Sequence, residues 1–241
     1  FFDKEAYHLI YQSGSYYKKS WFVFIGFVKR FFLMFNLKTH TIIFIHREAT
    51  PIGPPIFEWV IAKVLKKNII YDFDDAIWLE NTSQSNQLIS KIKKHSKVES
   101  ICKWSSSILC GNHFLMDFSK KFSNNVFHMP TTIDTVNKHN KLKEHKDKPV
   151  TIGWTGTHST IKYLYEIEEA LFSLQAKDNF RFIVISNKKP VFKKLSFEYI
   201  SWKEETEIND LLFFDIGIMP LSDTDWERGK CGFKALQYMA L

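Results

Sequence analysis

The sequence is poor in cysteine and lacks a long uninterrupted apolar run. Its 241 residues contain three cysteines, Cys102, Cys110 and Cys231, whose spacing matches neither a disulfide framework nor a thiolate metal site. We therefore expect a reducing compartment, the cytoplasm. The apolar run Trp21–Val28 is far short of the ~20 residues that a membrane-spanning helix needs, and a Lys-Arg pair follows it.

Several functional signatures are absent as well. The sequence has no G-x-S-x-G nucleophile elbow, no P-loop and no complete G-x-G-x-x-G. It also has no helix-turn-helix, zinc-knuckle or ribonucleoprotein motif, and its lysines are scattered over many segments, so we expect no nucleic-acid partner. The formal net charge of +7 and the pI near 9.1 nevertheless favour an anionic partner. An anionic membrane surface and a phosphorylated small molecule both fit that charge.

What is present is a regular alternation of short β-rich segments and segments of helical period. The predicted strands are 41–46, 69–73, 106–110, 125–129, 150–154, 180–186, 197–200 and 214–219. The predicted helices are 3–12, 54–66, 88–104, 112–121, 159–176, 204–211 and 230–241. This alternation predicts parallel βαβ units.

A polar, Lys-rich stretch divides the alternation. Asp134–Pro149 has no apolar period and predicts a linker. We therefore expect an α/β protein with two doubly wound Rossmann-like domains that face a cleft. They comprise residues 1–135 and 150–241 and are joined by residues 136–149.

The segment Tyr16–Lys38 combines aromatic and basic residues and predicts a further helix. Two interpretations stay open. In one, a basic aromatic helix rests on an anionic membrane surface, which makes the protein peripheral on the inner face of the cell membrane. In the other, the helix is buried in the first domain and its lysines and arginine point into solvent.

Polar residues follow the first two strands that precede this linker. They are His46, Arg47 and Glu48 after one strand, and Asp72, Asp74 and Asp75 at the end of the next. In an open parallel sheet, ligands bind outside the carboxyl ends of the strands. We therefore expect these six residues to form one wall of a binding site, either by contacting substrate or by structural hydrogen bonding.

The three aspartates also resemble an Asp-x-Asp metal motif. Carboxylates suit Mg²⁺ or Mn²⁺. Asp is equally a favoured residue at helix N-caps, and no second acidic cluster has recognisable ligand spacing. Structural, substrate-binding and metal-binding roles stay open for Asp72, Asp74 and Asp75.

Two glycine-containing segments follow strands of the second domain and could bind an anion. In the first, Gly156 and Thr157 precede a predicted helix, and Lys162 can reach the same anion. In the second, Arg228, Lys230 and Lys234 surround two glycines at the start of the last helix, which suits a diphosphate. A tight turn and a solvated basic loop are the plain structural alternatives.

Taken in order, these segments resemble a glycosyltransferase of the GT-B fold, of the retaining family 4 type. The resemblance rests on FIHREATPIGPP, IIYDFDDAIW, ILCGNHFLMDF, VFHMPTTIDT, TIGWTGTHSTIKYL, ISWKEETEINDLLFFDIGIMPL and GKCGFKALQYMAL. It covers most of the chain from residue 41. Each motif is loose, and their order and spacing are more specific than any one of them.

The resemblance implies transfer of a hexosyl or related group from a nucleotide-diphosphate sugar to a saccharide or lipid-linked acceptor, without metal or other cofactor. It implies a role in bacterial surface polysaccharide or glycolipid synthesis. Gly156, Thr157, Lys162, Arg228, Lys230 and Lys234 would then bind the donor, and His46 would act in the catalytic centre. Arg47, Glu48, Asp72, Asp74 and Asp75 would line the acceptor side or support it.

The sequence departs from the family pattern at three positions. Thr157 stands where the family often has Arg, and Gly229 and Gln237 stand where the family has a Glu-x7-Glu pair. Two other functions stay open: a non-catalytic nucleotide-sugar or phosphate-binding module, and a metal-dependent transferase that uses Asp72, Asp74 and Asp75. The absence of an initial Met and of a final helix stop signal leads us to expect a fragment with both domains incomplete.

Overall fold

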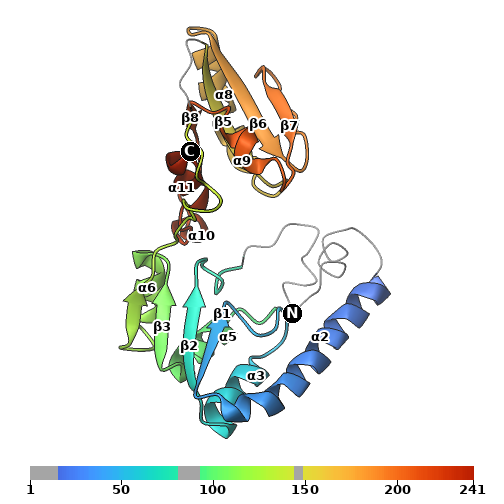
Figure 1. Ribbon diagram of the computed structural model, residues 1–241, viewed down its shortest axis with the longest axis vertical. Helices are drawn as coiled ribbons and strands as arrows, with labels where there is room; N and C mark the ends of the chain where they lie inside the picture. Colours follow the sequence, from blue (N-terminus) through green and yellow to red (C-terminus); the bar gives the residue numbers. More distant parts are fainter. Residues whose placement is uncertain (1–15, 81–92, 144–148) are drawn as a thin grey trace. The chain divides into compact units, whose positions relative to one another are not determined.

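The computed structural model describes residues 16–80, 93–143 and 149–241 (Figure 1). The chain is α/β and contains two parallel four-stranded sheets. It divides into two compact units. Unit 1 comprises Phe1–Pro130 and Arg228–Lys230, and unit 2 comprises Thr131–Glu227 and Cys231–Leu241.

All eight predicted strands are confirmed, with ends that differ from the predictions by at most two residues. In unit 1 they are β1 (Ile42–His46), β2 (Asn68–Phe73), β3 (Ser107–Cys110) and β4 (Val126–His128). They pair in the order β1-β2-β3-β4, all parallel. Because consecutive parallel strands need crossovers, a helical segment follows each of the first three strands.

Those crossovers begin later than their predicted ranges. The first is α3 (Ile56–Trp59), which continues as the π-helical segment η2 (Val60–Val64) and begins just after the Pro54-Pro55 pair. The others are α5 (Lys97–Trp104) and α6 (His113–Ser119). Residues 93–96 are not helical, and the predicted helix 3–12 and residues 88–92 lie outside the described residues.

Alternate residues of β2 supply the centre of the unit 1 core. Ile69, Tyr71 and Phe73 are fully buried. Ile101 of α5 and Ile108 of β3 are fully buried as well. This alternation leaves the polar strand ends, rather than the strand middles, for a binding site.

The remaining helical segments of unit 1 are α2 (Tyr16–Asn36) and the short 3₁₀ helix η1 (Leu37–Thr39). Between Tyr17 and Asn36, where burial is described, Gly26 is the one buried residue of α2, and large aromatic side chains along the helix are exposed. The interpretation of this segment as a buried helix is therefore wrong for the face that carries these exposed aromatic side chains. Among the described residues, no helix has the length and apolar character needed to cross a membrane.

In unit 2 the strands are β5 (Val150–Gly156), β6 (Phe180–Ser186), β7 (Glu198–Ser201) and β8 (Ile216–Gly217). They pair in the order β7-β6-β5-β8, all parallel. The chain moves outward from β5 to β7 and then returns to the other side of β5. The boundary between β5 and β8 is therefore a topological switch point, the place where open α/β sheets bind ligands.

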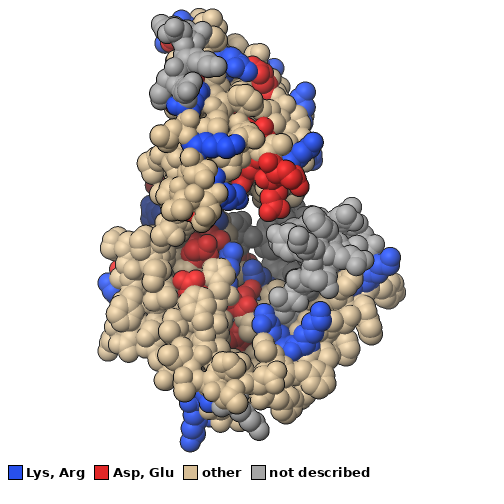
Figure 2. Space-filling view, in the orientation of Figure 1, with Lys and Arg blue, Asp and Glu red and all other residues tan. Residues whose placement is uncertain are grey.

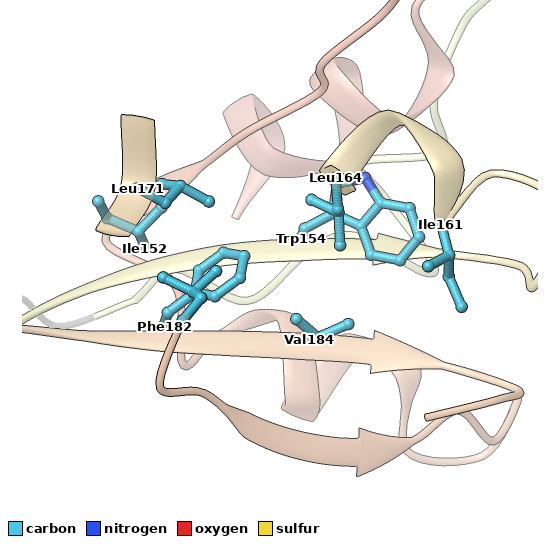
Figure 3. Close-up of a cluster of buried hydrophobic side chains, with 8 residues drawn as sticks. Ile152, Trp154, Ile161, Leu164, Leu171, Phe182 and Val184 are labelled. Atoms are coloured by element: carbon cyan, nitrogen blue, oxygen red, sulfur yellow. The ribbon is translucent and has the colours of Figure 1, made fainter. Parts of the chain in front are cut away.

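Helices cover both faces of this sheet. They are α7 (Lys162–Glu166), α8 (Glu168–Gln175), α9 (Glu207–Leu211) and α11 (Phe233–Ala240). Phe182 and Val184 of β6 pack with Trp154 and Leu164 on one face (Figure 3). The alternate residue Ile183 packs with Leu211, Phe214 and Tyr238 on the other. Two apolar faces with helices on each make this a Rossmann-like layer arrangement.

The predicted helix 159–176 is divided into α7 and α8, which meet at Ile167. Ile161, Leu164 and Leu171 of this segment are buried against the sheet, whereas Leu174 is exposed. A short helix that was not predicted, α10 (Asp225–Arg228), lies in the glycine-containing basic segment. The last helix begins at Phe233 because Gly232, with φ of +72°, ends the preceding turn.

Candidate functional site

The polar residues after β1 and β2 meet at the carboxyl edge of the unit 1 sheet. His46 is the register partner of Asp72. Its Nδ1 lies 2.7 Å from Asp72 Oδ2. The His46 side chain is 52% exposed, so its ring is held by a carboxylate on one side and open to solvent. A carboxylate at Nδ1 favours the tautomer that leaves Nε2 able to accept a proton.

The next residue, Arg47, adopts the left-handed conformation with φ of +61°. Its backbone N–H donates to Asp72 O at 2.7 Å, and its Nη2 donates to Asp75 Oδ2 at 2.8 Å. Lys230 Nζ donates to the other oxygen of Asp75 at 2.7 Å. Asp75 therefore joins two cations, one on each carboxylate oxygen. A non-glycine residue at this φ is uncommon and here is fixed by both hydrogen bonds.

Lys230 reaches Asp75 because residues 228–230 pack in unit 1. Asn112, the N-cap of α6, donates from Nδ2 to the carbonyl oxygens of Arg228 and Lys230, each at 3.1 Å. A Cβ on Gly229 would lie 2.6 Å from Ala76 Cβ and 2.8 Å from its backbone nitrogen. This packing leaves no room for a side chain at position 229.

A buried ionic network holds the loop that follows His46. Lys97 of α5 is fully buried, and its Nζ lies 2.8 Å from Glu48 Oε2 and donates to Thr50 O at 2.7 Å. Glu58 of α3 accepts from Ala49 N–H at 2.8 Å. Burial raises the pKa of Glu58 above the ordinary glutamate value, although the Ala49 hydrogen bond opposes that shift.

Glu48 was among the predicted residues, but two buried charged residues that hold the same loop were missed. Both missed residues, Glu58 and Lys97, are charged residues within apolar helix faces. Glu58 follows buried Phe57 and precedes buried Ile61 by one turn, and Lys97 precedes buried Ile101 by one turn. A charge at a core-facing helical position was the available signal, since such charges are buried only when paired.

The aspartates do not gather around a common point. Asp72 contacts His46, and both oxygens of Asp75 contact cations. Asp74 is half-buried. Within the ranges that the structure describes, no three His, Cys, Asp or Glu side chains are arranged to hold a metal ion. Figure 2 shows acidic and basic groups side by side over the ends of β1 and β2. Among the described residues, Asp72 and Asp75 are held in ion pairs with His46, Arg47 and Lys230.

In unit 2, the carboxyl end of β5 leads into a tightly bonded turn. Thr157 N–H donates to Thr160 Oγ1 at 3.1 Å, and His158 N–H donates to Asn187 Oδ1 at 2.7 Å. A Cβ on Gly156 would lie 2.4 Å from the Trp154 ring, so glycine lets the chain pass over that side chain. Two backbone N–H groups of the predicted phosphate turn therefore already have protein acceptors.

Two predicted cations border this turn. Lys162 Nζ is 4.0 Å from Glu227 Oε1, and the Lys162 side chain is 55% exposed. Lys234 Nζ lies 5.0 Å from the centroid of the buried Trp154 ring. Gly156 and Lys234 thus contact the same indole. Gly156, Thr157, Lys162 and Lys234 come together in unit 2, whereas Arg228 and Lys230 belong to unit 1.

Glu227 is the least expected member of the unit 2 site. It is 5% exposed in its side chain and accepts hydrogen bonds from the hydroxyl groups of Tyr163 and Thr224. Burial acts to raise its pKa, but these hydrogen bonds and the charge of Lys162 bring the pKa below the ordinary glutamate value. Glu227 is therefore a buried anion that sits beside an exposed lysine.

Two consecutive residues of α11, Gln237 and Tyr238, make specific contacts. Gln237 is buried, and its Nε2 lies 3.2 Å from Nε2 of His139. One residue later, Tyr238 accepts from Thr155 N–H at 3.0 Å, and burial raises the Tyr238 pKa to about 12. A Cβ on Gly217 would lie 2.2 Å from the Tyr238 ring. Tyr238 thus fixes α11 against β5 and β8, and Gln237 joins α11 to the segment that contains His139.

Comparison with models of known protein families and with curated proteins gives no match.

Proposed function

We propose that this chain is a glycosyltransferase of the GT-B type that moves a sugar from a nucleotide-diphosphate sugar to a saccharide or lipid-linked acceptor. The motif order that resembles family 4 motivates the reaction class, and bacterial surface polysaccharide or glycolipid synthesis is the setting it implies. The donor would be a cytoplasmic metabolite. Unit 2 would bind the donor, and unit 1 would supply the acceptor side.

The switch point beside β5 is the observation that carries the proposal. The reversal of strand order between β5 and β8 marks the edge where such sheets bind nucleotides. Gly156 lies at that edge, and Lys162 and Lys234 place two cations around the turn that follows it. Cations beside a switch point suit a nucleoside diphosphate better than an uncharged ligand.

The lysines would act on the leaving group. As the bond between the anomeric carbon and the diphosphate oxygen breaks, negative charge grows on the diphosphate. Lys162 would stabilise that charge at its exposed Nζ, and Glu227 beside it would hold the lysine in place. Cations that are already in position stabilise the transition state without the energetic cost of reorienting when the bond breaks.

His46 would act on the acceptor. Its contact with Asp72 orients the ring and leaves Nε2 to accept the proton of the acceptor hydroxyl as that oxygen bonds to the anomeric carbon. If the acceptor oxygen attacks the anomeric carbon from the side opposite the leaving group, the anomeric centre is inverted. The family resemblance instead implies retention. The anomeric proton coupling of the product, measured by NMR, decides between these two courses.

A thermal-shift screen of nucleotide sugars tests the donor site. A ligand that binds only the folded protein raises its melting temperature, so at least one nucleoside-diphosphate sugar should do so. The shift should persist in EDTA, because the proposed site uses lysines rather than a metal. Binding without any turnover would instead favour the non-catalytic module, and a shift that EDTA abolishes would favour the metal-dependent transferase.

A further inference from the structure

We propose that α2 docks this protein on an anionic lipid bilayer through an exposed aromatic stripe. The stripe comprises Tyr17, Trp21, Phe24, Val28, Phe31 and Phe35. Their exposed fractions run from 36% to 95%. Scattered exposed apolar residues are normal, but a contiguous set of this size marks an interaction surface. This inference does not rest on the proposed function.

The spacing of the stripe places it on one face of the helix. Successive members are separated by four, three, four, three and four residues, which is the period of a single apolar seam. A 21-residue helix is about 30 Å long, so the stripe extends along most of that length. Trp and Tyr at one end and Phe along the rest suit the boundary between headgroups and acyl chains.

The charge of α2 selects the partner. The helix has four basic residues and no acidic residue. Lys18 and Lys29 are exposed, and they lie on the same side of the stripe because eleven residues return an α-helix to within about 20° of its starting direction. Cations beside an apolar seam attract anionic lipid headgroups. They oppose a second copy of the same helix, since like charges would face each other.

The opposite face of α2 is fixed to unit 1. Arg30 donates from Nε to Ala49 O at 3.1 Å, and the Phe27 and Phe57 rings lie 6.0 Å apart. The stripe therefore projects from an anchored helix. Because Ala49 belongs to the loop after His46, docking through α2 would hold that loop near the lipid surface.

The hydrogen bond from Arg30 to Ala49 links the docking helix to the loop after His46. A bilayer at α2 would present lipid-linked acceptors to the side of unit 1 that carries His46. This step alone depends on the proposed function. If transfer fails while vesicle binding holds, the docking inference stands and the reaction class falls.

Vesicle flotation of the whole chain tests the inference. We expect binding to phosphatidylcholine vesicles that contain phosphatidylglycerol, weak binding to phosphatidylcholine alone, and release at high salt. Two double variants, Lys18→Glu with Lys29→Glu and Phe24→Ser with Phe31→Ser, should each weaken binding at least about tenfold. Their substituted side chains are exposed, so circular dichroism should show an unchanged fold.

Matched controls separate the stripe from general charge and apolarity. Lys120→Glu with Lys121→Glu makes the same change in net charge elsewhere in unit 1, and Leu142→Ser with Val191→Ser removes exposed apolar groups of unit 2. Both controls should bind vesicles as the wild type does. Equal loss in the controls, or no flotation of the wild type at low salt, would overturn the proposal. So would a wild-type dimer, seen by analytical ultracentrifugation, that Phe24→Ser with Phe31→Ser dissociates.

Discussion

The two candidate sites differ in how their charges are satisfied. In unit 1, His46, Arg47 and Glu48 each have a specific partner, and Lys97 beneath the loop is fully buried. In unit 2, Lys162 is more than half exposed and lies 4.0 Å from its nearest carboxylate oxygen. A paired network holds its geometry before substrate arrives, whereas an exposed lysine still has charge to offer an anion. The first arrangement suits positioning, and the second suits diphosphate binding.

Replacing His46 should produce the largest effect on activity. His46→Ala removes the proposed proton acceptor, so the rate of sugar transfer should fall by about 10²–10⁴-fold. Donor affinity, measured by calorimetry, should be nearly unchanged because the donor is assigned to unit 2. His40→Ala is the control, since His40 is exposed and precedes β1. Equal losses in donor affinity and transfer rate would remove His46 from the acceptor side.

Breaking the buried pair in unit 1 should have the largest effect on stability. Lys97→Met leaves Glu48 without its cation in a mostly buried site, which should lower the free energy of unfolding by about 3–5 kcal/mol. Urea denaturation measures this loss. The exposed Lys121→Met should change the value by less than about 0.5 kcal/mol. Similar effects of the two substitutions would show that the network is not structural.

Removing the exposed lysine of unit 2 should act mainly on binding. Lys162→Ala deletes a charge-assisted contact worth about 1.5–3 kcal/mol, so the donor Kd should rise about 10- to 100-fold. The free energy of unfolding should change little because the side chain is exposed. Lys177→Ala provides a control at an exposed lysine of the same unit. An unchanged Kd for Lys162→Ala would place the diphosphate elsewhere.

The smallest expected effect is a pH dependence that originates at Glu227. Its pKa is lowered in the folded state, so the unfolded chain binds the proton more readily. Its contribution to stability is full above the ordinary value near 4.5 and disappears as pH falls through the lowered pKa. Denaturation at neutral and at acidic pH should show a smaller acid loss for Glu227→Gln than for the wild type. The exposed Glu204→Gln should follow the wild type.

The sequence predicted the strands well because local pattern determines them. Apolar runs bounded by polar residues identified all eight strands, and the polar strand ends identified His46 and Asp72, which the structure brings together. Partners that are distant in the sequence could not be predicted in this way. Asn112 binds the backbone of residues 228 and 230, and Asp75 binds Lys230, across more than 100 residues.

Buried charges were the other limit. Helical periodicity treats Glu58 and Lys97 as interruptions of an apolar face, but the structure uses them to hold backbone groups of Ala49 and Thr50. Likewise, the sequence alone does not show why Gly stands at position 229 and Gln at position 237. Only packing shows that Ala76 excludes a side chain at Gly229 and that Gln237 contacts His139.

We propose that this chain transfers sugars from a diphosphate donor. The most direct measurement is release of nucleoside diphosphate from a panel of nucleotide sugars, with EDTA present, by the wild type and by Lys162→Ala. We expect release from at least one donor by the wild type and a marked decrease in Lys162→Ala. Absence of both binding and release for every donor, under conditions where the protein is folded, would contradict it.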